Sequence, residues 1–217
     1  VLIRVNPGID AHTHKYITTA TKDAKFGISI EKKDEIADMI RLINNAHHIH
    51  FKGFHAHIGS QIFVEDAFME EINTMLMFIM HMRDRYGVCT EQLDLGGGFA
   101  VRYTREDSPI PLEKLCSDMI AALENGIQEN DLDIKCVIIE PGRSIVCEAG
   151  CTVYGVGSFK KTDTLDYIFT DGGMADNIRP ALYQAEYSCE NISRPDAEKS
   201  ITYEIAGKCC ESGDILV

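Results

Sequence analysis

The sequence is short of basic residues. Lysine and arginine number 21 against 34 aspartate and glutamate residues, so the formal net charge of the 217 residues is −13. A protein that binds nucleic acid or an anionic membrane surface needs a basic patch. We therefore expect neither nucleic acid nor a membrane as a partner.

The sequence also lacks the patterns of a secreted or membrane protein. It contains no signal peptide and no apolar run long enough to span a bilayer. Its eight cysteines form no C-x-x-C pair, and their spacing does not indicate a disulfide framework. These absences predict a reduced protein of the cytoplasm.

What the sequence does contain is strand-like sequence at both ends, at Leu2–Val5 and Ile215–Val217. Neither end resembles a natural terminus. We therefore expect the chain to be part of a longer protein.

The first 150 residues alternate between short apolar runs and windows with helical spacing. Strands are predicted at 2–5, 53–58, 93–95 and 137–139, and helices over 34–46, from 66 onwards and over 112–125. Asp66 is expected to cap the second helix. This alternation predicts an α/β fold with a parallel sheet and right-handed crossovers.

The pattern changes near Cys151. Short β-type runs follow at 152–156, 167–170 and 201–205, separated by turn signals such as Asp171-Gly172-Gly173. We therefore predict two domains, 1–150 and 151–217, of which the second is rich in β-structure.

Turn and ligand-binding residues follow each of the four predicted parallel strands. These segments are Asn6-Pro7-Gly8, His57-Ile58-Gly59-Ser60, Gly96-Gly97-Gly98 and Glu140-Pro141-Gly142-Arg143. The carboxyl ends of parallel strands converge on one face, where glycines let backbone N–H groups approach an anion. With Ser60 and Arg143 as further donors, the segments predict a site for a phosphorylated ligand.

His55 and His57 share one face of their strand and raise the alternative of a metal site. A metal would need further ligands, but glycines and Glu140-Pro141-Gly142-Arg143 stand at the other strand ends. We therefore predict no metal, and interpret His55 as packed and bonded to backbone. His57 is suited to stack on a planar cofactor ring, and Glu140 to keep a pyridine nitrogen protonated.

Together these motifs resemble the pyridoxal-phosphate-dependent decarboxylases of the alanine-racemase-like fold. The motifs are Val5-Asn6-Pro7-Gly8, Lys25-Phe26-Gly27, His57-Ile58-Gly59-Ser60-Gln61, Leu93-Asp94-Leu95-Gly96-Gly97-Gly98 and Glu140-Pro141-Gly142-Arg143. Two more, Arg179-Pro180-Ala181-Leu182-Tyr183 and Cys209-Cys210-Glu211-Ser212-Gly213-Asp214, resemble the diaminopimelate decarboxylases. The resemblance extends over essentially the whole chain.

The resemblance implies the C-terminal half of a (β/α)8 barrel, followed by part of an all-β sandwich or barrel domain. It implies pyridoxal 5′-phosphate as cofactor, and decarboxylation of meso-2,6-diaminopimelate to L-lysine and carbon dioxide. The protein would be a homodimer with its active sites at the subunit interface.

The same resemblance implies roles for individual residues. His57 would stack on the pyridine ring and Glu140 would pair with its nitrogen. The phosphate and the near side of the substrate would be held by Ser60, Gly97, Gly98, Gly142 and Arg143.

The remaining implied roles concern the far end of the substrate and the proton donor. Arg179 and Tyr183 would bind the distal carboxylate, and Glu211 the distal ammonium. Cys210 would protonate the carbon that loses carbon dioxide. Cys210 and Glu211 would both reach into the partner subunit's site. A substrate with amino acid groups at both ends needs such a cation and such an anion.

The chain departs from the family in one respect. The Schiff-base lysine of the family belongs to an early barrel strand, upstream of Val1, and a late tyrosine belongs beyond Val217. Lys25 and Lys208 do not follow the strand that should carry the lysine. We therefore expect the chain by itself to be inactive.

Two alternatives stay open. One is a related decarboxylase that acts on ornithine, arginine or carboxynorspermidine, although ornithine-type relatives carry aspartate in place of Glu211 and lack the Arg179–Tyr183 pair. The other is a catalytically dead homologue that acts by binding a partner. The presence of His57, Glu140 and Cys210 argues against the second.

Overall fold

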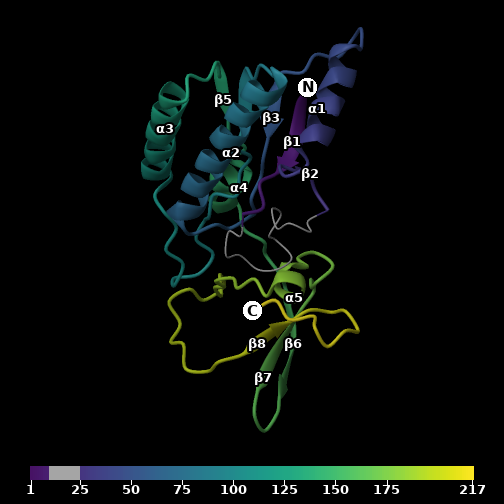
Figure 1. Cartoon of the computed structure of the whole chain (residues 1–217). Coiled ribbons are helices and arrows are strands. Elements are labelled where there is room, and N and C mark those ends of the chain that lie inside the picture. The colour runs from purple at the N-terminus through teal and green to yellow at the C-terminus, as the bar shows by residue number, and fades with distance from the viewer. Residues whose placement is uncertain (10–24) are drawn as a thin grey trace. The chain divides into compact units, whose positions relative to one another are not determined.

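The computed structural model describes residues 1–9 and 25–217, which form two compact units (Figure 1). The first unit comprises residues 1–101 and 109–147, and the second comprises 102–108 and 148–217. The sequence predicts the domains 1–150 and 151–217, and the units differ from these in the assignment of residues 102–108 and 148–150. No pattern in the sequence indicated that residues 102–108 belong to the second unit.

A five-stranded sheet with the order β2-β1-β3-β4-β5 forms the first unit, and all its neighbouring strands are parallel. The strands are β1 (Leu2–Asn6), β2 (Ile28–Ser29), β3 (Gly53–His55), β4 (Gln92–Asp94) and β5 (Cys136–Ile138). The predicted α/β class and parallel sheet are confirmed. The short β2 is an addition that the sequence did not predict.

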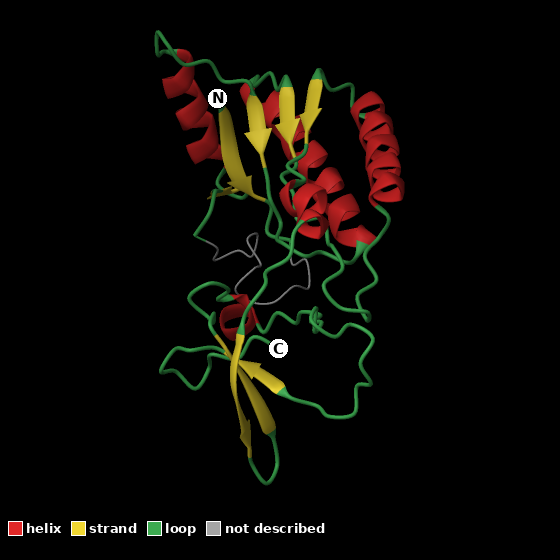
Figure 2. Ribbon diagram, turned by 180° about the vertical axis from the view of Figure 1, so that it is seen from behind, coloured by secondary structure: helices red, strands yellow, loops and turns green. Residues whose placement is uncertain are grey.

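Three helices cover one face of this sheet (Figure 2). They are α1 (Lys33–Asn44), α2 (Glu65–Tyr86) and α3 (Leu112–Glu129). The prediction that Asp66 caps α2 is wrong: Val64 is the N-cap residue, without a side-chain cap hydrogen bond, and Asp66 lies in the first turn. There its negative charge still interacts favourably with the helix dipole.

The core lies between the sheet and these helices. The apolar face of α2 is buried, with Ile72 and Met82 fully inaccessible. Phe54 of β3 is also inaccessible, and its ring packs edge-on against Phe78 of α2 with the centroids 4.9 Å apart. Since side chains alternate along a strand, the neighbour of Phe54, His55, points to the opposite face.

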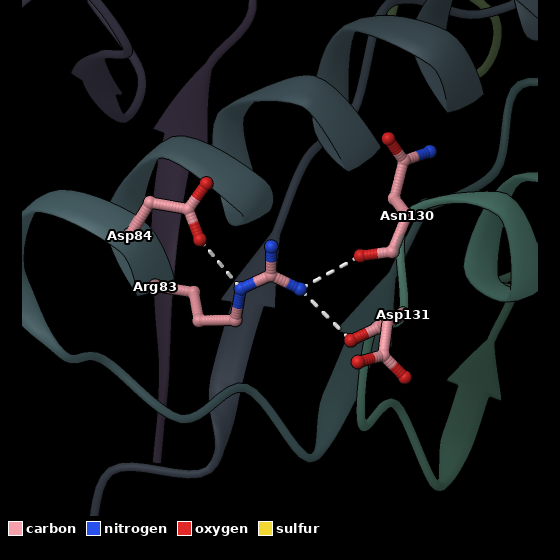
Figure 3. A network of polar contacts seen from close by, with 4 residues as sticks. All are labelled: Arg83, Asp84, Asn130 and Asp131. Carbon is pink, nitrogen blue, oxygen red and sulfur yellow. Dashed lines mark hydrogen bonds and ion pairs between the residues drawn. The ribbon is translucent and has the colours of Figure 1, made fainter.

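Hydrogen bonds from Arg83 link the C-terminal end of α2 to the residues that follow α3 (Figure 3). One guanidinium nitrogen donates to the backbone carbonyls of Asn130 and Asp131, at 2.7 and 2.8 Å. The Nε atom donates to Asp84 at 2.7 Å. The carbonyls that follow α3 therefore receive hydrogen bonds from a cation, which is favourable at a helix C-terminus.

The second unit contains a small sheet of β6 (Val156–Lys161), β7 (Asp166–Thr170) and β8 (Glu204–Ala206). β6 and β7 are antiparallel, whereas β7 and β8 are parallel. A short helix, α5 (Arg179–Tyr183), lies between β7 and β8 in the chain. The separate β-structure predicted for this half is confirmed.

Two further findings concern the chain as a whole. All eight cysteines are free. Within residues 1–9 and 25–217, every helix is too short or too polar to cross a membrane.

Candidate cofactor-binding site

The loops that follow β3 and β4, together with Glu140, Pro141 and the short helix α4 (Gly142–Val146) after β5, line a pocket of about 190 Å³ in the first unit. Its lining residues are His57, Ser60, Gly97, Gly98, Phe99, Glu140, Pro141, Gly142, Arg143 and Ser144. These include all seven residues for which the sequence predicted a role at the cofactor. Asn6-Pro7-Gly8, the fourth predicted strand end, is not part of the lining.

The glycines form a wall of backbone in the pocket. A Cβ atom on Gly97 would lie 2.1 Å from the carbonyl oxygen of Glu140. Gly98 has a φ of +101°, and a Cβ atom there would lie 2.4 Å from the carbonyl oxygen of Gly59. The glycine run is therefore needed for the close packing of the strand ends, and this packing leaves room for a ligand to approach the backbone.

His57 is held in one tautomer by this glycine backbone. Its Nδ1 atom accepts the N–H of Gly97 at 3.2 Å, which assigns the ring hydrogen to Nε2. Burial lowers the pKa of His57 below its usual 6.5, and the nearby charges of Arg4 and His55 lower this pKa further. A neutral, oriented imidazole is suited to stack on an aromatic ring. Sequence reasoning missed Arg4, which no motif marks.

His55 lies beside the acid of the site. Its Nε2 atom is 3.8 Å from Oε1 of Glu140, and its side chain is only 16% exposed, so His55 packs against the acid of the site. Asp94 is buried and accepts the N–H of Gly96 at 2.9 Å. Polar atoms of His55, Asp94 and Glu140 lie within 4.8 Å of one another. Sequence reasoning missed Asp94, although its position at a strand end was visible.

The opposite side of the pocket carries hydrogen-bond donors. Nη1 of Arg143 donates to Oγ of Ser60 at 2.9 Å, which joins the loop after β3 to α4. A guanidinium, a hydroxyl and glycine backbone suit a phosphate. The His57 ring and the Glu140 carboxylate suit a protonated pyridine. The donor set therefore fits pyridoxal 5′-phosphate.

The predicted pair Arg179 and Tyr183 lies on α5 in the second unit. The Arg179 guanidinium lies over the rings of Tyr103 and Tyr183, 5.3 and 5.6 Å from their centroids. Its Nε atom donates to the Tyr187 hydroxyl at 2.8 Å, and the Tyr187 ring packs edge-on against Tyr103. Sequence reasoning missed Tyr103 and Tyr187, since they lie outside the motif.

Cys210 and Glu211 lie in the second unit as well, in the exposed loop after β8. Both side chains are accessible to solvent. The predicted site residues are thus divided: seven surround the pocket of the first unit, and four belong to α5 and this loop.

Comparison with known proteins places the chain in one family. Residues 1–147 match the family model described as the pyridoxal binding domain of pyridoxal-dependent decarboxylases. The chain is 42% identical to the diaminopimelate decarboxylase of Bacillus subtilis and 42% identical to that of Staphylococcus aureus. Each alignment includes the whole chain, but only 49% and 50% of the relative. The chain thus spans about half the length of the curated relatives it matches.

The fold agrees with this relationship. The crystal structure of diaminopimelate decarboxylase from M. jannaschii in complex with L-lysine superposes with a TM-score of 0.85 at 29% identity. The superposition covers the whole chain and 48% of the solved one. The predicted half-barrel is confirmed by this fold, and the predicted cofactor by the family model. The β-structure predicted after the barrel is present as a separate three-stranded sheet. With its match over residues 1–147, this chain belongs to the pyridoxal-dependent decarboxylases.

Proposed function

We propose that the complete protein that carries this chain decarboxylates meso-2,6-diaminopimelate to L-lysine and carbon dioxide. The observation that carries the proposal is the gathering of His57, Gly98 and Glu140 in one pocket with the donors Ser60 and Arg143. The relatives named above support the choice of substrate. The M. jannaschii enzyme was crystallised with L-lysine, the product that the proposed reaction would yield.

Pyridoxal 5′-phosphate, when bound, supplies a conjugated ring that accepts the electrons of the bond that breaks. In our proposal the carboxylate of Glu140 holds the proton on the pyridine nitrogen, and the neutral ring of His57 stacks against the pyridine. The phosphate would be bound by Ser60, Gly97, Gly98, Gly142 and Arg143. Arg143 would also contact the near side of the substrate.

Arg179 would select the substrate by its distal carboxylate, with Tyr183 beside it. An arginine fork binds a carboxylate through two parallel hydrogen bonds. The contacts with Tyr103 and Tyr187 restrict this guanidinium before substrate arrives, which lowers the entropy lost on binding. Glu211 would pair with the distal ammonium. Ornithine has no distal carboxylate, so this arrangement favours a diamino diacid.

Cys210 would return a proton to the carbon that loses carbon dioxide. We infer that Cys210 and Glu211 act in the site of a second subunit of a homodimer, which their exposed loop leaves accessible to a partner. We also propose that the protein acts in the cytoplasm, in keeping with its eight free cysteines.

The experiment uses the complete protein. It should purify yellow with bound cofactor and release carbon dioxide from meso-2,6-diaminopimelate much faster than from ornithine, arginine or carboxynorspermidine. A colourless protein, or one that prefers ornithine, contradicts the proposal. A protein that binds cofactor but releases no carbon dioxide from any of these substrates would favour a partner-binding homologue instead.

A matched pair of variants tests the assigned roles. Cys210→Ala should lower kcat while the protein stays yellow, because the proton donor is lost and the cofactor pocket is unchanged. Cys189→Ala is the control, since Cys189 is also exposed and has no role here. An unchanged kcat in Cys210→Ala would remove the acid role.

A further inference from the structure

Asp214 is a buried carboxylate below an exposed loop. Its residue is 2% accessible, whereas Cys210 and Glu211, four and three positions before it, are exposed. Both carboxylate oxygens accept backbone N–H groups, Oδ1 from Met174 at 2.5 Å and Oδ2 from Cys209 at 2.7 Å.

The two donors belong to different loops of the second unit. Met174 lies in the turn that leads into α5, and thus to Arg179 and Tyr183. Cys209 immediately precedes Cys210. The Asp214 carboxylate therefore joins the segment of the proposed distal-carboxylate residues to the segment of the proposed proton donor.

The glycines around Asp214 fit this arrangement. A Cβ atom on Gly173 would lie 2.6 Å from Oδ2 of Asp214, and one on Gly207 would lie 2.2 Å from the same atom. Each glycine comes from one of the two loops. The backbone hydrogen bond from Lys208 N–H to the Gly172 carbonyl, at 3.1 Å, links the same loops again. The carboxylate thus occupies space that both loops leave open for it.

We propose that Asp214 is a positioning residue that holds the Cys210–Glu211 loop and the Arg179–Tyr183 helix in one fixed arrangement. The inference rests on the proposed function, since it gives these four residues their roles. It adds a physical link between proton donation and recognition of the distal carboxylate. Asp214 itself contacts no reacting atom in this proposal.

The test is Asp214→Asn in the complete protein. Asparagine keeps the size of the side chain, but its NH2 group cannot accept a hydrogen bond, so one of the two backbone N–H groups loses its acceptor. Hydrogen exchange at Met174 or Cys209 should accelerate about tenfold or more, since each lost bond exposes its amide to local opening. The value of kcat/KM for meso-2,6-diaminopimelate should fall about a hundredfold, with both kcat and KM altered, because a small displacement of catalytic groups has this effect.

Asp176→Asn is the matched control. The Asp176 carboxylate accepts the N–H of Gly173 at 3.0 Å within the turn before α5. Among the described residues, Asp176 makes no hydrogen bond to the Cys210 loop. Its replacement should raise KM and leave both kcat and exchange at Cys209 unchanged. A positioning role that spans both loops predicts this difference, whereas a general loss of stability would affect both variants alike.

Unchanged exchange at Met174 and Cys209, or an unchanged kcat, in Asp214→Asn would overturn the inference. If that variant fails to fold, hydrogen exchange is measured in the wild-type protein instead. The amides of Met174 and Cys209 should then exchange more slowly than the amide of exposed Ser212, and equal rates would overturn the inference. Slow exchange at both amides in a wild-type protein that is inactive on meso-2,6-diaminopimelate would defeat the proposed function, while supporting the link between the loops.

Discussion

The two units bury a carboxylic acid in opposite ways. Glu71 of α2 in the first unit is fully inaccessible, and neither of its oxygens has a hydrogen-bond partner among the described residues. Burial raises its pKa well above the usual 4.5, and the charge of Asp94 raises this pKa further. Asp214 of the second unit, in contrast, has a backbone donor on each oxygen.

The difference reflects the amount of apolar core. The first unit has a continuous core between its sheet and its helices, and in such a core the neutral form of a buried acid costs less free energy than the charged form. The second unit buries few apolar side chains, among them Ala206 and Leu216. Its loops therefore depend on carboxylates such as Asp171 and Asp214 that accept backbone N–H groups. The cofactor pocket is thus fixed by packed backbone, and the proposed substrate-binding loops by polar contacts.

The largest effect on stability is expected where two backbone segments pack directly against each other. Gly97→Ala places a methyl group 2.1 Å from the Glu140 carbonyl oxygen, and only movement of a strand end can relieve the clash. We expect the free energy of unfolding to fall by about 3 kcal/mol, as in an overpacked core. Urea unfolding of the complete protein measures it.

Gly142→Ala is the control in the same pocket, because a Cβ atom there meets nothing within 4 Å. It should change the free energy of unfolding by less than about 0.5 kcal/mol. Equal losses in the two variants would contradict a pocket wall formed by packed backbone.

The unpaired acid of the first unit predicts a pH dependence. The folded protein holds the Glu71 proton more tightly than the unfolded chain, so stability falls as pH rises above the unfolded value of 4.5 towards the raised pKa. Glu71 lowers the free energy of unfolding by at most about 1.4 kcal/mol for each pH unit in this range. Glu71→Gln should remove that slope in urea titrations at several pH values.

Exposed Glu70 on the same helix provides the control. Glu70→Gln should keep the slope of the wild-type protein. If Glu71→Gln also keeps it, the acid is ionised in the folded state, and the contrast with Asp214 fails.

In the second unit the matching glycine test should have a smaller effect. Gly207→Ala meets the end of the Asp214 side chain, which can move, rather than backbone. We expect a loss of about 1 kcal/mol and faster hydrogen exchange at Cys209. Gly213→Ala, with nothing within 4 Å of its Cβ atom, should change neither. A loss from Gly207→Ala as large as that from Gly97→Ala would remove the distinction between the two units.

The smallest effect is expected at the surface of the first unit. Arg83→Ala removes the hydrogen bonds to the carbonyls of Asn130 and Asp131 and should lower Tm by about 1–3 °C. Arg85→Ala, at an exposed position on the same helix, should leave Tm unchanged. Equal Tm values for both variants would mean that the apolar core alone joins α2 and α3.

Local patterns of the sequence predicted much of the first unit. Apolar runs of β-branched residues predicted the strands, and apolar residues at helical spacing predicted the helices. These patterns arise because the apolar side of each element is buried in the core. Parallel connectivity then brought the strand ends to one edge, so His57 and Glu140 were predicted at one pocket from the sequence. Arg179 and Cys210 came from the resemblance to a family, since no local pattern indicates their roles.

Only the tertiary structure determined which groups face one another. It paired Arg143 with Ser60 and His55 with Glu140, and it enclosed Asp214 between two loops. These contacts join residues that are distant in the chain. Hydrogen-bond geometry and burial depend on the distance in space, whereas sequence periodicity reports only which face of an element is apolar. The sequence therefore predicted where a site would form, and packing determined the contacts within it.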